Sequence, residues 1–197
     1  MSTLILASAS PARARLLQEA GIAFAADPVS VDEIAVKDAF RRAGRSAAEC
    51  AQALAETKAR RGCARHPGAL VLGCDQMLVL GDDWFDKPGT QAAARAQLRA
   101  LRGKTHALPT AAALARDGQI LWRAVETPRL AMRDLTDAEL DAYLANAGDA
   151  ALGSVGAYQI EGAGAALMAS VEGDRATIQG LPLKALQAWL HQAGAAA

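Results

Sequence analysis

The stretch SASPAR, residues 8–13, places two hydroxyls and a guanidinium directly after the apolar run Leu4–Ala7. Serine followed by proline is typical of a helix start, where unpaired N–H groups and the positive end of the helix dipole face outward. Together with Ser8, Ser10 and Arg13, these groups would make an anion pocket suited to phosphate. An ordinary helix cap with a solvated arginine is the simpler alternative, and the spacing alone favours it.

Lys58 and Asp75 bring charge to positions where the hydrophobic pattern predicts burial. Lys58 lies four residues after Leu54, on the apolar stripe of a helix that starts at the capping box of Ser46. Its ammonium either extends outward at the helix end or points into a polar cleft, and both interpretations stay open. Asp75 interrupts the strand-like run VLGCDQMLVL, and a buried carboxylate is costly unless it is paired or bound to a metal. A bulge that exposes Asp75 is the alternative, and we favour the functional carboxylate.

Asp32, Glu33 and Lys87 are further polar groups that the pattern places near turns. Asp32 and Glu33 follow a strand-like segment, Pro28–Val31, and taken alone they indicate a solvated turn. Across a cleft from Asp75 they would suit Mg²⁺, which takes few carboxylates together with phosphate oxygens. Lys87 precedes a proline and so sits on a stiff loop, although exposed lysines most often have no function.

The elements that must position these residues alternate between helix and strand, which indicates an α/β fold. Caps and stops predict helices from Ser10 to Ala20, Ser46 to Gly62, Thr90 to Arg102, Thr136 to near Gly148, and from Pro182 onward. Apolar runs predict strands at Leu4–Ala7, Ala69–Cys74, Met77–Leu80, His106–Leu114, Ile120–Met132 and Ala166–Val171. The glycine-rich stretch 153–164 is expected to form a loop plus a strand, with Glu161 near the strand end.

Composition excludes several classes of function. At 197 residues, 52% apolar and 21% charged, the chain is expected to form one globular domain over residues 1–197. Its 21 basic and 21 acidic residues balance, which argues against nucleic acid or an anionic membrane as a partner. No run approaches the roughly 20 apolar residues that span a bilayer. Three cysteines without a CxxC pair indicate reduced thiols, and with no secretory leader we expect a cytoplasmic location. The histidines His66, His106 and His191 lack metal-ligand spacing and are expected to be structural or solvated.

Nine short motifs occur in order along nearly the whole chain. They are LILASASPAR at 4–13, VDE at 31–33, ETKA at 56–59, GCDQ at 73–76, DKP at 86–88, LRGKTH at 101–106, LTDAEL at 135–140, GAYQIEG at 156–162 and GLP at 180–182. One such motif would be weak, but the ordered series resembles the Maf family of nucleoside triphosphate pyrophosphatases, also named for the inhibition of septum formation.

The resemblance implies both a fold and a reaction. The implied fold is a mixed, twisted sheet flanked by helices, with two lobes around a deep cleft, similar to the inosine-triphosphatase-like pyrophosphatases and often found as a homodimer. The implied reaction cleaves a nucleoside triphosphate between its α and β phosphates, which releases a monophosphate and pyrophosphate. It requires a divalent metal, Mg²⁺ or Mn²⁺.

The resemblance also implies roles for individual residues. Asp75 matches the catalytic acidic residue, the proton acceptor, and Asp75 with Glu33 would hold the metal. The substrate-binding and phosphate-binding positions of the family's motifs correspond to Ser8, Ser10, Arg13, Lys58 and Lys87.

Three positions bear on the base of the nucleotide. Gln76 and Glu161 are similar to the branch of the family that acts on 7-methyl-GTP, whereas the pyrimidine branch has a threonine and a glutamine. A carboxylate can accept hydrogen bonds from the guanine N1–H and N2 amino group. Ala12 departs from the arginine or tryptophan of the family, and alanine does not stack on a cationic base. We therefore expect 7-methyl-GTP or a related nucleotide, with dTTP or UTP as the alternative.

A nucleotide-binding regulator of cell division without turnover is the rival from another class, because Ala12 removes a typical side chain from the site. The set Asp75, Glu33 and Lys58 argues against it, since binding alone does not require a carboxylate beside phosphate. A nucleic-acid-binding module is weaker still, given the zero net charge and 4% aromatic residues.

Overall fold

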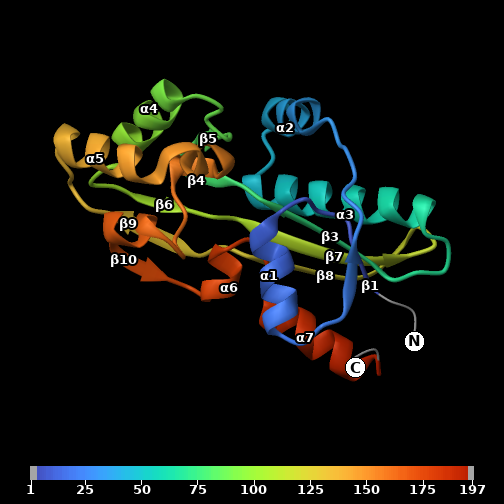
Figure 1. Cartoon of the computed structure of the whole chain (residues 1–197). Helices are drawn as coiled ribbons and strands as arrows, with labels where there is room; N and C mark the ends of the chain where they lie inside the picture. Colours follow the sequence, from blue (N-terminus) through green and yellow to red (C-terminus); the bar gives the residue numbers. More distant parts are fainter. Residues whose placement is uncertain (1–3, 195–197) are drawn as a thin grey trace. The chain divides into compact units, whose positions relative to one another are not determined.

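The computed structural model describes residues 4–194. By its internal contacts the chain divides into two units, of which the first comprises residues 1–76, 110–126 and 174–197 and the second residues 77–109 and 127–173. Each unit contains its own five-stranded sheet, so the predicted α/β class with mixed strands and flanking helices is confirmed (Figure 1). The single functional domain over residues 1–197 and the cleft between two lobes stay predictions.

The sheet of the first unit is mixed, with the strand order β2-β1-β3-β7-β8. Its strands are β1 (Leu4–Leu6), β2 (Phe24–Ala26), β3 (Val71–Gln76), β7 (Thr110–Arg116) and β8 (Gln119–Glu126). The first three pair in parallel, whereas β3 with β7 and β7 with β8 pair antiparallel. The hairpin of β7 and β8 turns at Asp117 and Gly118, both with positive φ, as a tight turn requires.

Helices cover both faces of this sheet, with α3 along one face and α1 and α7 along the other (Figure 1). The helices of this unit are α1 (Pro11–Glu19), α2 (Glu33–Arg42), α3 (Ala47–Arg65), α6 (Arg175–Ile178) and α7 (Leu183–Gln192). The expected caps are confirmed: Ser10 caps α1 with Pro11 at its first turn, and Ser46 with Glu49 forms a capping box for α3.

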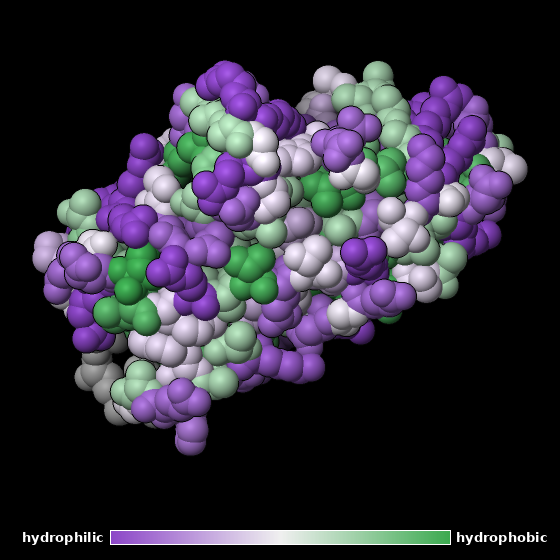
Figure 2. All heavy atoms as spheres, turned by 180° about the vertical axis from the view of Figure 1, so that it is seen from behind, coloured by the Kyte–Doolittle hydropathy of each residue, from purple (hydrophilic) through white to green (hydrophobic). Residues whose placement is uncertain are grey.

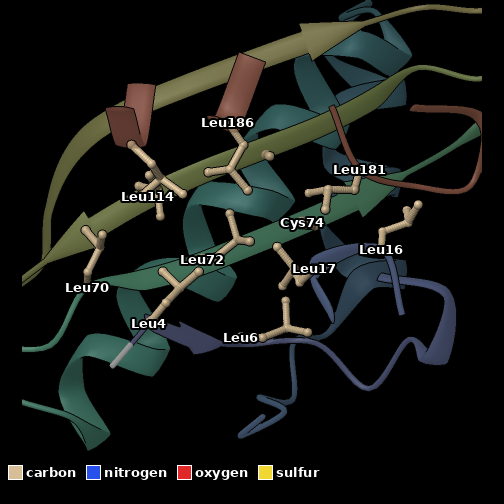
Figure 3. Close-up of a cluster of buried hydrophobic side chains, with 12 residues drawn as sticks. Leu4, Leu6, Leu16, Leu17, Leu70, Leu72, Cys74, Leu114, Leu181 and Leu186 are labelled. Carbon is tan, nitrogen blue, oxygen red and sulfur yellow. The ribbon is translucent and has the colours of Figure 1, made fainter. Parts of the chain in front are cut away.

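The face covered by α1 and α7 holds a cluster of buried side chains, drawn in Figure 3. Leu6 of β1 and Leu72 of β3 lie in it with Leu17 of α1 and Leu186 of α7, and each of these side chains is fully buried. Burial of one such side chain contributes about 1.5–3 kcal/mol, so the cluster fixes α1 against the sheet. The start of α1, where the serines and the arginine lie, is thereby held at the end of β1.

The opposite face accepts α3 at unusually short range because β3 contains a glycine there. A Cβ added to Gly73 would lie 2.1 Å from the carbonyl oxygen of Ala55 and 2.6 Å from the amide nitrogen of Ala59. The backbones of helix and strand therefore approach more closely than any side chain would permit. Two residues further along β3, on the same face, is Asp75.

The sheet of the second unit is wholly antiparallel, with the order β10-β9-β6-β4-β5. Its strands are β4 (Leu78–Leu80), β5 (Asp83–Phe85), β6 (Thr105–Ala107), β9 (Arg129–Met132) and β10 (Met168–Glu172). Two packed helices accompany it, α4 (Gln91–Leu101) and α5 (Asp137–Ala147), together with 3-10 helices at Gly148–Gly153, Val155–Ala157 and Ala163–Leu167.

Several expected elements are wrong in detail, and glycine and proline explain most of the differences. The run His106–Leu114 is two strands, β6 and β7, because Pro109 lacks the N–H that a continuous ladder needs. The run Ile120–Met132 likewise breaks into β8 and β9 at Pro128. Gly62 does not end α3 but lies inside it, buried against Val71.

Two expected strands are absent from the described residues. The stretch 153–164 forms 3-10 turns and no strand, with Gly156 at a φ of +77° that a strand residue does not adopt. Pro28–Val31 is irregular and leads into α2, which the sequence pattern missed because only Lys37 is buried on that helix.

The surface seen in Figure 2 carries hydrophilic residues with small hydrophobic groups between them. Among residues 4–194 the large apolar side chains that are exposed are Ile34, Leu121 and Val171. Within that range no helix has the length and apolar character to cross a bilayer. The three cysteines are buried and unpaired, as predicted.

Gly73→Ala is expected to destabilise the protein, since the added methyl group meets backbone atoms that have no room to move aside. Overpacking of this kind costs about 3 kcal/mol. Urea denaturation measures the loss. Gly153→Ala is the control, because a Cβ at Gly153 meets nothing within 4 Å. Equal stability of the two variants would contradict the close packing of α3 on β3.

His106 predicts a stability that depends on pH. It is buried in the second unit with its Nε2 2.6 Å from the hydroxyl of Tyr158, and burial lowers its pKa from 6.5 to about 4. Between these values the unfolded chain binds the proton and the folded chain does not. The free energy of unfolding therefore falls as the pH drops from about 6.5 to about 4, by about 3 kcal/mol.

Denaturation curves at intervals between pH 4 and pH 7 test this expectation on the parent protein and on His106→Gln. The variant should show a shallower fall, because its side chain at this position does not titrate. A fall of the same steepness in both proteins would show that other groups cause it.

Candidate active site

The predicted site residues of the first unit gather where the parallel strands β1 and β3 end. Leu6 of β1 pairs with Leu72 of β3, so the residues after β1 and the last residues of β3 lie at the same edge of the sheet. Ser8 follows β1 at this edge, and Asp75 and Gln76 end β3 there. The carboxyl ends of parallel strands are the usual position of ligands in open α/β sheets.

Arg13 is held at this edge by three oxygen atoms. Its Nε donates to the carbonyl of Gly180 at 2.8 Å, and its Nη1 donates to the hydroxyl of Ser8 at 2.9 Å and to the carbonyl of Cys74 at 3.1 Å. Within residues 4–194, Nη2 has no hydrogen-bond partner. No carboxylate pairs with this guanidinium in that part of the chain. Arg13 is thus a positioned cation with donor capacity left for an anion.

Lys58 connects two carboxylates. Its Nζ lies 2.6 Å from Oδ1 of Asp75 and 2.6 Å from Oε1 of Glu33. Lys58 and Asp75 are 8% and 4% exposed, so an ammonium that extends into solvent and a bulge that exposes Asp75 are both wrong. Asp75 pairs regularly with Ala111 of β7, and the strand around it has no irregularity. The structure therefore supports the polar-cluster interpretation of both residues.

Glu33 reaches Lys58 because it begins α2. Asp32, predicted as part of a solvated turn, is instead the N-cap of this helix and accepts from the amide of Ala35. The irregular segment before it is fixed to the end of α3, since Arg65 donates to the carbonyl of Pro28 at 2.9 Å. Helix α3 therefore positions the ammonium of Lys58 directly. Through Arg65 it also fixes the segment that leads to Glu33.

Lys37 belongs to the same cluster, and sequence analysis did not find it. It is buried on α2, one turn after Glu33, with Nζ 3.9 Å from Oε2 of that carboxylate. The charges of Lys37, Glu33, Lys58 and Asp75 therefore alternate in sign. The Glu-x-x-x-Lys spacing is the signal in the sequence, although it is common on solvated helices as well.

Burial has the largest single effect on the pKa values of Lys58 and Asp75. It raises the pKa of Asp75, while the ammonium of Lys58 acts in the opposite direction and favours the carboxylate. For Lys58 burial lowers the pKa, but the attraction of Asp75 and Glu33 outweighs it, so the net pKa of Lys58 is raised and the ammonium stays charged. Burial also raises the pKa of the Cys74 thiol to about 11, which excludes a thiolate nucleophile at neutral pH.

One atom of this cluster is left without a partner. Oδ2 of Asp75 is buried and makes no hydrogen bond within residues 4–194. The same part of the chain contains no group of three or more His, Cys, Asp or Glu side chains able to hold a metal ion. A carboxylate oxygen without a partner next to Glu33 suits Mg²⁺, which binds through one or two carboxylates and completes its shell with phosphate and water.

The other predicted residues lie as follows. Ser10 caps α1 and Ala12 is partly exposed in its first turn, both at the edge described above. Lys87 is exposed in the irregular segment after β5, and Glu161 lies in a turn before a 3-10 helix. Both belong to the second unit. The structure thus brings together Ser8, Arg13, Glu33, Lys58 and Asp75, and the roles of Lys87 and Glu161 stay predictions.

Gly180→Ala is expected to weaken anion binding. Gly180 has a φ of +103°, and an added Cβ would lie 3.2 Å from Nε of Arg13, so alanine both strains the turn and displaces the guanidinium. We expect the Kd for pyrophosphate, measured by calorimetry, to rise about tenfold. This corresponds to the loss of one charge-assisted hydrogen bond between Arg13 and the anion.

Gly21→Ala is the matched control for this variant. Gly21 also has a positive φ, +69°, but a Cβ there meets nothing within 4 Å. The control shares the backbone strain and leaves Arg13 in place. An equal loss of pyrophosphate affinity in both variants would contradict the role of the Gly180 turn.

Comparison with known proteins agrees with this geometry. The family model described as Maf-like protein matches residues 3–193. A nucleoside triphosphate pyrophosphatase of Paramagnetospirillum magneticum is 53% identical over 190 residues, which are 96% of this chain and 98% of the relative. Another from Rhodospirillum rubrum is 49% identical over 97% of this chain and 95% of its own length. A 7-methyl-GTP pyrophosphatase of Brucella abortus is 48% identical over 96% of this chain and 95% of its own. On these matches along nearly its whole length, the chain belongs to the Maf-like protein family.

Proposed function

We propose that this chain hydrolyses a nucleoside triphosphate between its α and β phosphates, to a monophosphate and pyrophosphate. The observation that carries the proposal is Asp75, a buried carboxylate with one oxygen on Lys58 and the other without a partner. At the same edge of the sheet, the Nη2 atom of Arg13 can donate hydrogen bonds to an anion. The relatives in the family are named as pyrophosphatases of this kind.

In this mechanism Asp75 is the proton acceptor for the attacking water. Burial has raised its pKa, which makes the carboxylate a stronger base than an exposed aspartate. Lys58 holds Oδ1, so Oδ2 is the atom left to accept the proton of the attacking water. Arg13 and the hydroxyls of Ser8 and Ser10 bind phosphate oxygens and stabilise charge on the leaving pyrophosphate.

Divalent Mg²⁺ or Mn²⁺, held by Asp75 and Glu33, would supply charge neutralisation on the triphosphate. Lys87 is proposed as a further phosphate contact, through its exposed ammonium. We also propose that the enzyme acts in the cytoplasm as a homodimer. We propose further that it binds no nucleic acid, because its net charge is zero.

For the base we propose 7-methyl-GTP or a related modified nucleotide. The pair Gln76 and Glu161 supports this choice, and one relative at 48% identity is named a 7-methyl-GTP pyrophosphatase. Ala12 supports neither branch of the family, since it lacks both the large side chain that would stack on a cationic purine and the arginine typical of the pyrimidine branch. A pyrimidine pyrophosphatase acting on dTTP or UTP is therefore the second candidate.

Asp75→Asn is expected to lower kcat by at least about 100-fold, since the amide does not accept the proton of the attacking water. The measurement is pyrophosphate release from 7-methyl-GTP, GTP, UTP, dTTP and CTP with Mg²⁺ or Mn²⁺. The matched control is Asp82→Asn, because Asp82 is exposed in the turn before β5. Release at the parent rate by Asp75→Asn would contradict the assignment.

The same panel separates the candidates for the substrate. Highest activity on 7-methyl-GTP supports the proposed base, and highest activity on UTP or dTTP supports the second candidate. Nucleotide binding without any release of pyrophosphate would instead support a non-catalytic regulator.

A further inference from the structure

The two carboxylates proposed as metal ligands already have cations of the chain beside them. One ammonium, Nζ of Lys58, lies 2.6 Å from Oε1 of Glu33 and 2.6 Å from Oδ1 of Asp75. A second ammonium, Nζ of Lys37, lies 3.9 Å from Oε2 of Glu33. Three of the four carboxylate oxygens therefore face a lysine. The fourth, Oδ2 of Asp75, is buried and has no hydrogen-bond partner within residues 4–194.

Lys37 is a fixed part of this arrangement. Its side chain is 9% exposed, although α2 buries no other residue. An ammonium is seldom buried unless a charge of opposite sign holds it, and Glu33 lies one turn before Lys37 in the same helix. The lysine therefore contributes a positive charge that stays beside the carboxylates and that salt screens less than it screens a solvated charge.

The charges at this edge of the first unit favour anions. Arg13 is a third cation, and its charge acts on the carboxylate of Asp75. Lys58 stays protonated, because the attraction of the two carboxylates outweighs its burial. Three positive and two negative side chains leave a net charge of +1 on this group of five. A divalent cation that approached the group by itself would be repelled by that net charge.

A triphosphate would reverse the sign of the charge at this edge. It brings several negative charges, and its oxygens are ligands with which Mg²⁺ completes its shell beside one or two carboxylates. The positive groups that repel a free cation are the groups that attract this anion. Cation and triphosphate would therefore each favour the binding of the other at this edge.

We propose that Lys37 and Lys58 are resident counter-ions that keep free divalent cations out of the site, so that the cation binds only together with a triphosphate. Lys37 acts through Glu33 and is a positioning residue, since its charge occupies one side of that carboxylate. This inference rests on the proposed function, because it describes how the same site takes up its metal.

Binding of Mn²⁺ to the parent protein tests the proposal without any turnover. Electron paramagnetic resonance counts the free ion, and the protein alone should take up no stoichiometric Mn²⁺ below about 0.1 mM. Calorimetry then measures the Kd of α,β-methylene GTP and α,β-methylene UTP, which have no α–β phosphoanhydride oxygen to cleave. For at least one of them the Kd should be at least about tenfold lower with Mn²⁺ than with EDTA.

Two substitutions of Lys37 separate its charge from a merely structural role. Lys37→Met keeps an unbranched side chain without the charge, so Mn²⁺ alone should bind at least about tenfold more tightly. Lys37→Arg keeps the charge and should retain the weak binding of the parent. A merely structural role would weaken Mn²⁺ binding in Lys37→Met, because a displaced Glu33 is a poorer ligand.

The control variant is Lys104→Met, which removes an exposed lysine of the second unit. It changes the net charge of the chain by the same amount as Lys37→Met. It should leave the uptake of Mn²⁺ unchanged. A gain equal to that of Lys37→Met would show that net charge alone is responsible, and would overturn the role of Lys37.

Other outcomes identify which proposal fails. Uptake of one Mn²⁺ per chain by the parent protein below about 0.1 mM would overturn the inference, and this measurement needs no variant to fold. Unchanged or weaker binding of Mn²⁺ in Lys37→Met would overturn it as well, as would a Kd for both analogues that Mn²⁺ does not alter. Each of these results leaves hydrolysis standing. A parent protein that binds neither analogue, with or without Mn²⁺, and releases no pyrophosphate from any triphosphate contradicts the proposed function itself.

Discussion

The ion pair of Lys58 with Asp75 is the interaction on which the candidate site depends. Both groups are buried, and either charge alone would carry a large desolvation penalty at its position. Glu33 also binds the ammonium. Nζ of Lys58, in α3, therefore connects the start of α2 to the end of β3. The two oxygens of the carboxylate also differ, since Oδ1 is bonded to Lys58 and Oδ2 has no hydrogen-bond partner within residues 4–194.

This contact exists because helix and strand approach without side chains between them. Gly73 permits the backbone of α3 to lie against β3, and Ala55 and Ala59 present only methyl groups at the same place. Lys58 lies between these two alanines in the helix, so its long side chain runs along the sheet and reaches Asp75. A larger residue at the glycine would separate the layers and move the ammonium away from the carboxylate.

Sequence reasoning predicted the parts of the site where a polar residue interrupts an apolar pattern. Asp75 and Lys58 stand out in this way, and the cap at Ser10 identifies the helix start beside them. Helix α2 was missed because the one residue it buries is Lys37. In the sequence a buried lysine cannot be told from a solvated one, so the helix shows no apolar stripe. The contact of Arg13 with a carbonyl 167 residues further along has no local signature at all. Pairing across such distances is set by the tertiary fold, as is the choice between a hydrogen-bonded and a solvated amide at the end of a strand.

The turn after α6 accepts from both Arg13 and Gln76, yet it is contributed by the last segment of the first unit, residues 174–194. During synthesis Ser8, Ser10, Arg13 and Asp75 all leave the ribosome well before this turn does. A growing chain therefore contains every charged group of the cluster for much of its translation without the carbonyls that orient two of its side chains. The orientation of Arg13 and Gln76 is therefore completed only after residues 177–180 have been synthesised and have folded against the end of β3.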